Sequence, residues 1–187
     1  MTWIVVLVVV AVVAGWLVAT YNGLVRRRNM AEEGWSGIDV QLKRRADLIP
    51  NLVEAVKGYA THERALLENV TALRNQARAA PAEDVAARGQ IEGMLSGALG
   101  RLLAIVENYP ELKANQNFLE LQQSLQAVEH DIQMSRRYYN GAVRDLNVMI
   151  ESFPSNLVAG WFRFAKKAFF EVGSEAEREA PKVSFPQ

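Results

Sequence analysis

The chain has 187 residues, with 21 Lys and Arg against 21 Asp and Glu, and it has no cysteine. A balanced charge gives no support for nucleic-acid binding, which depends on a basic excess. The absence of cysteine excludes disulfides, thiol catalysis and thiolate metal sites. The length suffices for one membrane anchor and one modest domain. Because the alternation typical of strands is missing beyond the first segment, we expect the soluble part to be all-α.

The first segment has the length and composition of a membrane span. Residues 3–24 carry no charge, and about 20 apolar residues cross a bilayer core as a helix. Trp3 and Tyr21 stand where the two membrane interfaces should be. A cleaved signal peptide is the alternative, but no basic residue precedes the apolar run and "VATYN" matches a cleavage site poorly. We therefore expect a transmembrane anchor over residues 1–25.

The charges that flank this segment predict its orientation. Arg26, Arg27 and Arg28 follow the span directly, whereas no Lys or Arg precedes it. The positive-inside rule then places the amino terminus outside and the bulk of the chain in the cytoplasm.

Two long apolar seams with alternating spacings of three and four residues predict helices that pack as in a left-handed coiled coil. The upstream seam passes Pro50 in phase, and the downstream seam lies in a helix expected to begin at Pro110 and end before Pro154. The upstream seam comprises Ala31, Trp35, Ile38, Leu42, Arg45, Ile49, Leu52, Val56, Tyr59, Glu63, Leu66, Val70, Leu73 and Ala77. The downstream seam comprises Phe118, Leu121, Leu125, Val128, Ile132, Ser135, Tyr139, Ala142, Leu146, Met149 and Phe153.

A shorter helix is expected between the two seams, over about residues 83–107, with Ile91, Leu95, Ala98, Leu102 and Ile105 on its apolar face. The loops "AAPAED" and "NYPE" flank it. The helices would form an antiparallel up-and-down bundle over residues 26–153. Pro50 either kinks one long helix, as the unbroken register favours, or separates two helices, as a count of four favours.

Five stretches of the sequence resemble the LemA family, in the expected order and over nearly all of the chain after the anchor. They are "YNGLVRRRN", "GWSGIDVQLKRRADLIPNLVEAVKGYATHE", "NYPELKAN", "RRYYNGAVRDLN" and "SFPSNLVAGWFRF". The resemblance implies a bacterial membrane protein with one amino-terminal span and a helical bundle of four helices, which favours Pro50 as a helix boundary. It supplies no catalytic or cofactor-binding residue.

No catalytic, cofactor-binding or metal-ligating residue is predicted. The two histidines, His62 and His130, lack the Glu-x-x-His spacing of a di-iron bundle. Polar residues nevertheless occupy seam positions, namely Arg45, Glu63 and Ser135. Because such residues cost stability but fix helix pairing, we hypothesise that Arg45 and Glu63 form a polar layer in the core. If they instead face a groove, they could receive a helix of a partner.

Residues 154–171 are predicted to form an amphipathic helix with aromatic residues on one face and basic residues on the other. That pattern is typical of a helix lying on a bilayer surface, although the same face could cover the open end of the bundle. Residues 172–187 are polar and contain proline, so we expect a loosely ordered tail.

These features predict a non-enzymatic, single-span protein of the bacterial inner membrane that serves as a scaffold or adaptor for other proteins. The alternative is a lipid-organising or membrane-remodelling protein that acts through the amphipathic helix of residues 154–171. The expected partners are the lipid bilayer and unidentified proteins, not nucleic acid, and a homo-oligomer is compatible with the sequence.

Overall fold

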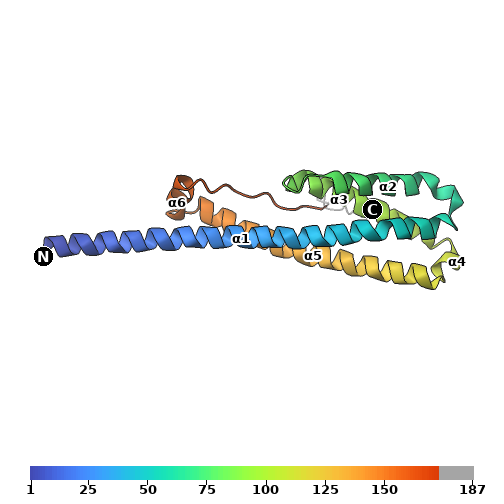
Figure 1. Ribbon diagram of the computed structural model, residues 1–187, viewed down its shortest axis with the longest axis horizontal. Helices are drawn as coiled ribbons and strands as arrows, with labels where there is room; N and C mark the ends of the chain where they lie inside the picture. Colours follow the sequence, from blue (N-terminus) through green and yellow to red (C-terminus); the bar gives the residue numbers. More distant parts are fainter. Residues whose placement is uncertain (173–187) are drawn as a thin grey trace, which may run out of the picture. The chain divides into compact units, whose positions relative to one another are not determined.

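The computed structural model describes residues 1–172, and all regular elements in that range are helices (Figure 1). The predicted tail of residues 172–187 lies outside the described residues, apart from Val172. The elements are α1 (Thr2–Lys57), the 3₁₀ helix η1 (Thr61–Glu63), α2 (Arg64–Ala79), α3 (Val85–Val106), α4 (Pro110–Lys113), α5 (Gln116–Glu151) and α6 (Ser155–Trp161).

The chain divides into two compact units, and both α1 and α5 contribute residues to each. Unit 1 comprises Met1–Ile38 and Met134–Phe169, and unit 2 comprises Asp39–Gln133 together with the segment that begins at Phe170. Unit 2 thus contains parts of four long helices, α1, α2, α3 and α5. This confirms the expected all-α fold with a bundle of packed helices.

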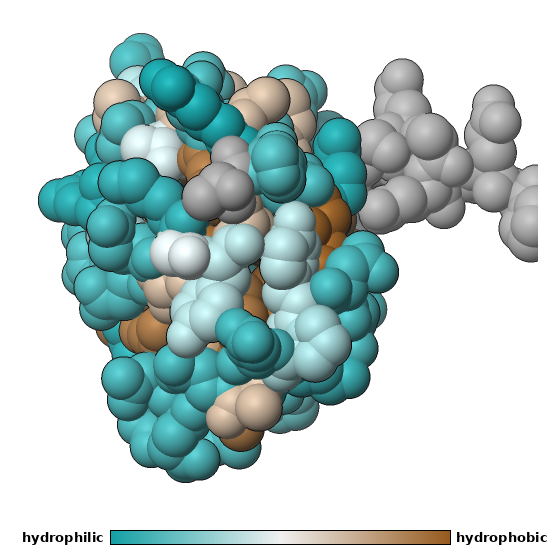
Figure 2. Space-filling model, turned by 90° about the vertical axis from the view of Figure 1, so that its right-hand side faces the viewer, coloured by the Kyte–Doolittle hydropathy of each residue, from teal (hydrophilic) through white to brown (hydrophobic). Residues whose placement is uncertain are grey.

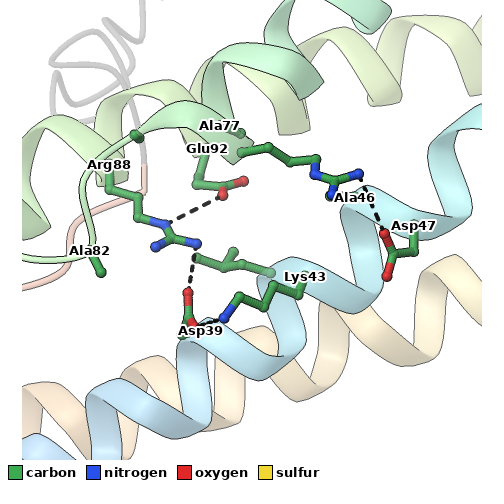
Figure 3. Close-up of a pocket in the computed structure, with 11 residues that line it drawn as sticks. Asp39, Lys43, Ala46, Asp47, Ala77, Ala82, Arg88 and Glu92 are labelled. Atoms are coloured by element: carbon green, nitrogen blue, oxygen red, sulfur yellow. Dashed lines mark ion pairs between the residues drawn. The ribbon is translucent and has the colours of Figure 1, made fainter.

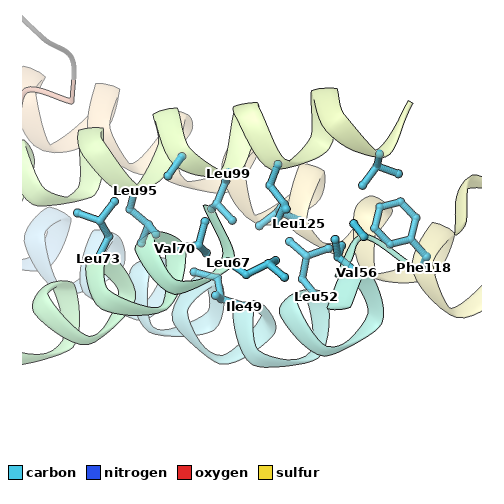
Figure 4. Close-up of a cluster of buried hydrophobic side chains, with 14 of the residues drawn as sticks. Ile49, Leu52, Val56, Leu67, Val70, Leu73, Leu95, Leu99, Phe118 and Leu125 are labelled. Carbon is cyan, nitrogen blue, oxygen red and sulfur yellow. The ribbon is translucent and has the colours of Figure 1, made fainter. Parts of the chain in front are cut away.

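The core of unit 2 is built largely from the seam residues that the heptad patterns predict, but it also contains Leu67, Leu99 and Leu112, which were not predicted. Of the predicted seam residues, Tyr59 is exposed and Leu66 is only partly buried. Ile49, Leu52 and Val56 of α1 pack with apolar residues of the other three helices (Figure 4). The buried residues of those helices and their connections include Leu67, Val70, Leu73, Leu95, Leu99, Leu102, Leu112, Phe118 and Leu125. Burying a side chain of this kind contributes about 1.5–3 kcal/mol relative to leaving it exposed.

Pro50 lies inside α1, so the expectation that it separates two helices is wrong. The pyrrolidine side chain is on the exposed face of the helix, where it displaces no core residue. The chain reverses later, after Lys57, where Gly58 follows the last helical residue as glycine often does. The reversal was not predicted because the apolar spacing continues in phase through it.

The connections on either side of α3 lie at the two proline-containing loops that the sequence predicts. Asp84 caps α3 by accepting a hydrogen bond from the amide of Ala87 at 3.0 Å. The helix expected to begin at Pro110 is divided, because Asn115 interrupts it after the short α4. The Asn115 side chain accepts a hydrogen bond from the amide of Phe118 at 3.2 Å, as an N-cap of α5.

The face of unit 2 at which α1 turns into α2 is mainly hydrophilic. Figure 2 looks onto this end, where hydrophilic residues cover most of the surface and hydrophobic residues show only as small separate areas. This surface is typical of a domain that faces water.

Unit 1 contains the apolar first part of α1. An 18-residue window of this helix has a mean hydropathy of 2.7 and is not covered by any other described part of the chain. By length and composition it is the one helix among residues 1–172 that could cross a membrane. Its final turn is different, because Leu24 is buried in a small core with Leu146 of α5 and with Val158 and Ala159 of α6.

The predicted helix over residues 154–171 is mostly absent, because α6 ends at Trp161. Arg163 adopts a left-handed conformation with φ 56°. Its amide donates to the Gly160 carbonyl at 3.2 Å, and the Phe164 amide donates to the Ala159 carbonyl at 2.9 Å. This pair of bonds is the Schellman motif that ends helices. This helix end is difficult to predict from the sequence, because the left-handed position is usually occupied by glycine and here it is occupied by arginine.

The chain beyond α6 has no regular secondary structure as far as Val172 and is held by side chains of α5. The Asn147 side chain donates to the Lys167 carbonyl at 2.9 Å and accepts from the Lys167 amide at 3.0 Å. The Tyr139 hydroxyl donates to the Ala168 carbonyl at 2.8 Å. These bonds satisfy backbone groups that an α-helix would otherwise have paired internally.

Candidate functional site

The most unusual feature of unit 2 is a layer of charged side chains in its interior. Arg45 occupies a core position of α1 and is 1% exposed, and Glu92 of α3 is 2% exposed. Ser96 lies one turn after Glu92, so the two side chains share a face of α3. Glu129 approaches from α5 and remains partly exposed. Three helices therefore meet at this layer.

Arg45 is the centre of the layer. Its Nη1 donates to Glu129 Oε1 and to Ser96 Oγ, both at 2.6 Å. Its Nη2 donates to the Glu92 carboxylate and, at 3.3 Å, to the Glu92 carbonyl. A guanidinium is well suited to this role because its planar fork reaches several acceptors at once.

A second set of charges continues the layer on one side. Arg88 Nη2 lies 2.7 Å from Asp39 Oδ1, and Lys43 Nζ lies 2.6 Å from Asp39 Oδ2 (Figure 3). Arg88 Nε also lies 4.0 Å from Glu92 Oε1, which links the second set to the first. These side chains line an open cavity of about 390 Å³, together with Arg78 and Asp47, which form an ion pair at 3.9 Å.

The charges that line this cavity balance one another. Three are negative (Asp39, Asp47 and Glu92) and three are positive (Lys43, Arg78 and Arg88), and each takes part in an ion pair. A site that binds a charged ligand needs charge in excess of its internal pairs. The arrangement therefore favours fixing the positions of helices over binding an ion.

The sequence-based hypothesis of a polar layer located Arg45 correctly but named the wrong partner. Glu63 lies in η1, at the reversal before α2, and is only partly buried. Arg45 pairs instead with Glu92 and Glu129. Ser135 lies in the other unit, where it is also partly buried.

The partners Glu92 and Arg88 carry a signal in the sequence that was missed. The buried face of α3 includes Arg88, Glu92, Leu95, Leu99, Leu102 and Val106, which again alternate by four and three residues. The expected face used Ile91 and Ile105, which are only partly buried. A search for seams that allowed charged residues would have placed Glu92 on the buried face of α3. Its negative charge would then have indicated it as a partner of Arg45.

The histidines occupy exposed positions, His62 in η1 and His130 on α5. Among residues 1–172, no group of three or more His, Cys, Asp or Glu side chains could hold a metal ion.

One titratable group in unit 1 is shifted by its surroundings. Burial raises the pKa of Tyr139 above its ordinary value, because removing the phenol from water disfavours the charged phenolate. Its ring packs against Trp35 with the two ring centroids 5.6 Å apart. Together with its bond to the Ala168 carbonyl, this makes Tyr139 a structural residue of unit 1.

An apolar helix long enough to span a membrane and a packed helical bundle with an internal charged layer indicate the class: a membrane-associated protein with a helical domain. The model of the LemA family matches residues 34–185. The chain belongs to the LemA family.

The chain is also similar to several named proteins. The chain is 27% identical over 190 residues to magnetosome protein MamQ 1 and to MamQ 2 of Paramagnetospirillum magneticum, covering 89% of this chain and 70% of each relative. It is 27% identical over 157 residues to protein LemA of Metamycoplasma hominis, covering 84% of this chain and 71% of the relative.

Proposed function

We propose that this chain is a membrane-anchored scaffold or adaptor of the bacterial inner membrane. The first part of α1 serves as an uncleaved anchor, and unit 2 presents a fixed surface to other proteins. The amino terminus lies outside and the bundle lies in the cytoplasm, in agreement with the arginines that follow the span.

The observation that carries the proposal is the Arg45 layer. A buried charged group contributes little net stability, but its partners must stay in one arrangement to avoid an unpaired buried charge. Arg45 therefore favours a single pairing of α1, α3 and α5. A bundle that keeps one helix arrangement offers partners a constant surface, which is what a scaffold requires.

The course of α1 supports an anchor that is retained. The helix continues without interruption past the apolar run, and Leu24 is buried against α5 and α6. Signal peptidases act on segments near small residues in an accessible conformation, whereas the end of this apolar run is helical and packed. The anchor is therefore an integral part of unit 1.

Photo-crosslinking in intact cells tests the scaffold proposal. A photoreactive amino acid is placed in the full chain at Val40 or at Met94, which are exposed on α1 and α3 respectively. We expect reproducible adducts with the same small set of proteins at one or both positions. The Arg45→Ala substitution should abolish these adducts while the chain stays in the membrane fraction.

Arg44→Ala provides the matched control, because Arg44 is an exposed neighbour on the same helix. It should leave the adducts unchanged. Adducts that persist in the Arg45→Ala variant, or no protein adduct at either position, would contradict a scaffold that depends on the bundle.

The alternative of a lipid-organising protein acting through a long surface helix has less support, since that helix ends at Trp161 and residues 164–172 have no regular secondary structure.

A further inference from the structure

After the polar residues Ser155 and Asn156, the short helix α6 carries apolar side chains on its buried face and on its exposed face. Val158 and Ala159 are buried in the small core of unit 1. On the other face Leu157 is 61% exposed and Trp161 is 85% exposed. Apolar side chains on the outward face of a helix are typical of a contact with protein or with a membrane, because a water-exposed face is usually polar.

Two neighbouring residues extend this exposed surface. Phe153, just before α6, is 80% exposed, and Phe162, just after it, is 55% exposed. We call the four side chains Phe153, Leu157, Trp161 and Phe162 the aromatic patch. Large apolar side chains gathered at one place on a surface mark a contact with another protein or with a membrane.

Ring contacts hold α6 beside the end of the apolar run of α1 (Figure 1). The Phe162 and Tyr21 ring centroids are 4.7 Å apart, and those of Phe164 and Tyr21 are 5.8 Å apart. Leu24 of α1 shares a core with Val158. The aromatic patch therefore lies level with residues 21–24 of α1.

Residues 21–24 are where the span should leave the hydrocarbon. A helix rises about 1.5 Å per residue, so a core of about 30 Å takes up roughly 20 residues. With Trp3 at one interface, Tyr21 lies at the other. The charges agree, because the Arg28 guanidinium lies 5.5 Å from the Phe164 ring centroid, and arginines at this depth contact lipid headgroups.

We propose that the aromatic patch inserts into the lipid leaflet at which the apolar run of α1 ends, as a second membrane contact of the chain. The occupant is lipid because Phe162 of the patch contacts Tyr21 at the end of the apolar run, and residues of that run such as Trp16 and Leu17 are themselves exposed. Aromatic side chains are favoured at this depth, where an apolar ring meets a polar boundary. The inference rests on α1 being a retained membrane span.

Spin labelling of the full chain tests this proposal, and the absence of native cysteine makes single labels unambiguous. Leu157→Cys and Trp161→Cys are labelled and reconstituted in vesicles of phosphatidylcholine and phosphatidylglycerol. Both side chains are exposed, so their replacement removes little core packing. Val10→Cys serves as the reference inside the bilayer, and Met94→Cys serves as the reference in water.

The rate at which each spin label collides with oxygen, which concentrates in lipid, is compared with the rate at which it collides with a water-soluble nickel chelate. We expect the oxygen-to-nickel ratio at positions 157 and 161 to exceed that at Met94 several-fold and to fall below that at Val10. A ratio equal to that at Met94 would overturn the proposal. Spin–spin broadening at positions 157 and 161 in dilute vesicles would also overturn it, because the patch would then contact a second copy.

The Val10 label separates this inference from the anchor itself. A low ratio at Val10 would show that α1 does not span the bilayer, and both proposals would fail. A high ratio at Val10 with water-like values at positions 157 and 161 would retain the anchor and remove only the second contact.

Discussion

Proline 50 has no amide hydrogen to donate to the carbonyl of Ala46, one turn earlier in α1, and its ring pushes that carbonyl aside. The structure supplies another donor. Arg74 of α2 places its Nε 3.0 Å from the Ala46 oxygen. The side chain of a neighbouring helix thus satisfies the group that the proline leaves unpaired. This explains why α1 continues through Pro50 without a break.

The coupling between Pro50 and Arg74 is measurable. Arg74→Met keeps the aliphatic stem but removes the donor, and should lower the free energy of unfolding by about 1–2 kcal/mol. In a Pro50→Ala background the alanine amide can bond to Ala46 itself, so the cost of Arg74→Met should fall. Denaturant unfolding of the four proteins in detergent gives the coupling energy. Equal costs in both backgrounds would contradict the compensation.

Arg45 gives a second prediction at the scale of single residues. Arg45→Ala removes the nearer of the two cations that pair with the buried Glu92 carboxylate, and the loss of a buried partner costs about 3–5 kcal/mol. Combining it with Glu92→Gln should recover part of this loss, since the amide carries no charge. The exposed Arg44, 3.7 Å from Asp131, is the control, and Arg44→Ala should change stability by less than about 1 kcal/mol. Equal effects of the two alanine variants would exclude a special role for the layer.

Tyr139 makes stability depend on alkaline pH. Its pKa is raised in the folded state by burial, so its contribution is fully present below the unfolded value of about 10. That contribution is lost as the pH rises from this value through the folded pKa. Tyr139→Phe should flatten this alkaline decline, and should cost about 1 kcal/mol at neutral pH through the lost bond to Ala168.

The adjacent Tyr138, which is exposed, provides the comparison for Tyr139. Unfolding curves of Tyr138→Phe should show the same alkaline decline as the parent chain. If Tyr139→Phe also declines as the parent does, the buried phenol is not the responsible group.

Among the secondary-structure elements, α3 contains four glycines, and two of them, Gly89 and Gly97, have opposite surroundings. A Cβ added at Gly89 would overlap the backbone oxygen of Glu171, whereas a Cβ at Gly97 meets no atom within 4 Å. Alanine is favoured over glycine in a helix by about 1 kcal/mol. Gly97→Ala should therefore raise stability by about that amount, and Gly89→Ala should displace the segment around Glu171.

Trypsin digestion measures the displacement of this segment, because Lys166 and Lys167 precede it. We expect faster cleavage after Lys167 in Gly89→Ala than in the parent chain or in Gly97→Ala. Equal cleavage rates in all three proteins would show that the segment does not depend on close approach to Gly89.

The elements differ in how far the sequence predicts them, and the reason is the range of the interactions that form them. The seams of α1 and α5 depend on local periodicity, so most of their predicted members, such as Leu42 and Leu125, are buried, whereas Phe153 lies past the end of α5 and is exposed. The reversal after Lys57 was missed because the apolar phase continues past it. The end of α6 was missed because Arg163 takes a conformation usually reserved for glycine.

The candidate site was less predictable than the helices. Arg45 was identified because it interrupts a local pattern, but its partners Glu92 and Glu129 lie 47 and 84 residues away in the chain. A single sequence contains no direct record of such pairings. Only charge complementarity between seams, tested over all pairs of helices, could have indicated them.

At the scale of the whole molecule, orientation in the membrane depends on the charges at the end of the apolar run. Arg26, Arg27 and Arg28 all follow it, and the Arg27 guanidinium turns back to donate to the Gly23 carbonyl at 3.3 Å. Positive charge near a span is retained in the cytoplasm. A reporter that is active only in the cytoplasm should therefore be active when it is fused to the carboxy terminus.

Moving the charge should change this orientation. We expect replacement of the three arginines by serine, together with three lysines inserted after Met1, to shift a large fraction of the carboxy-terminal reporter to the other side. The lysine insertion alone separates the two contributions and should give a smaller shift. If the combined variant keeps the original orientation, the bundle itself, not the flanking charge, determines which side of the membrane it occupies.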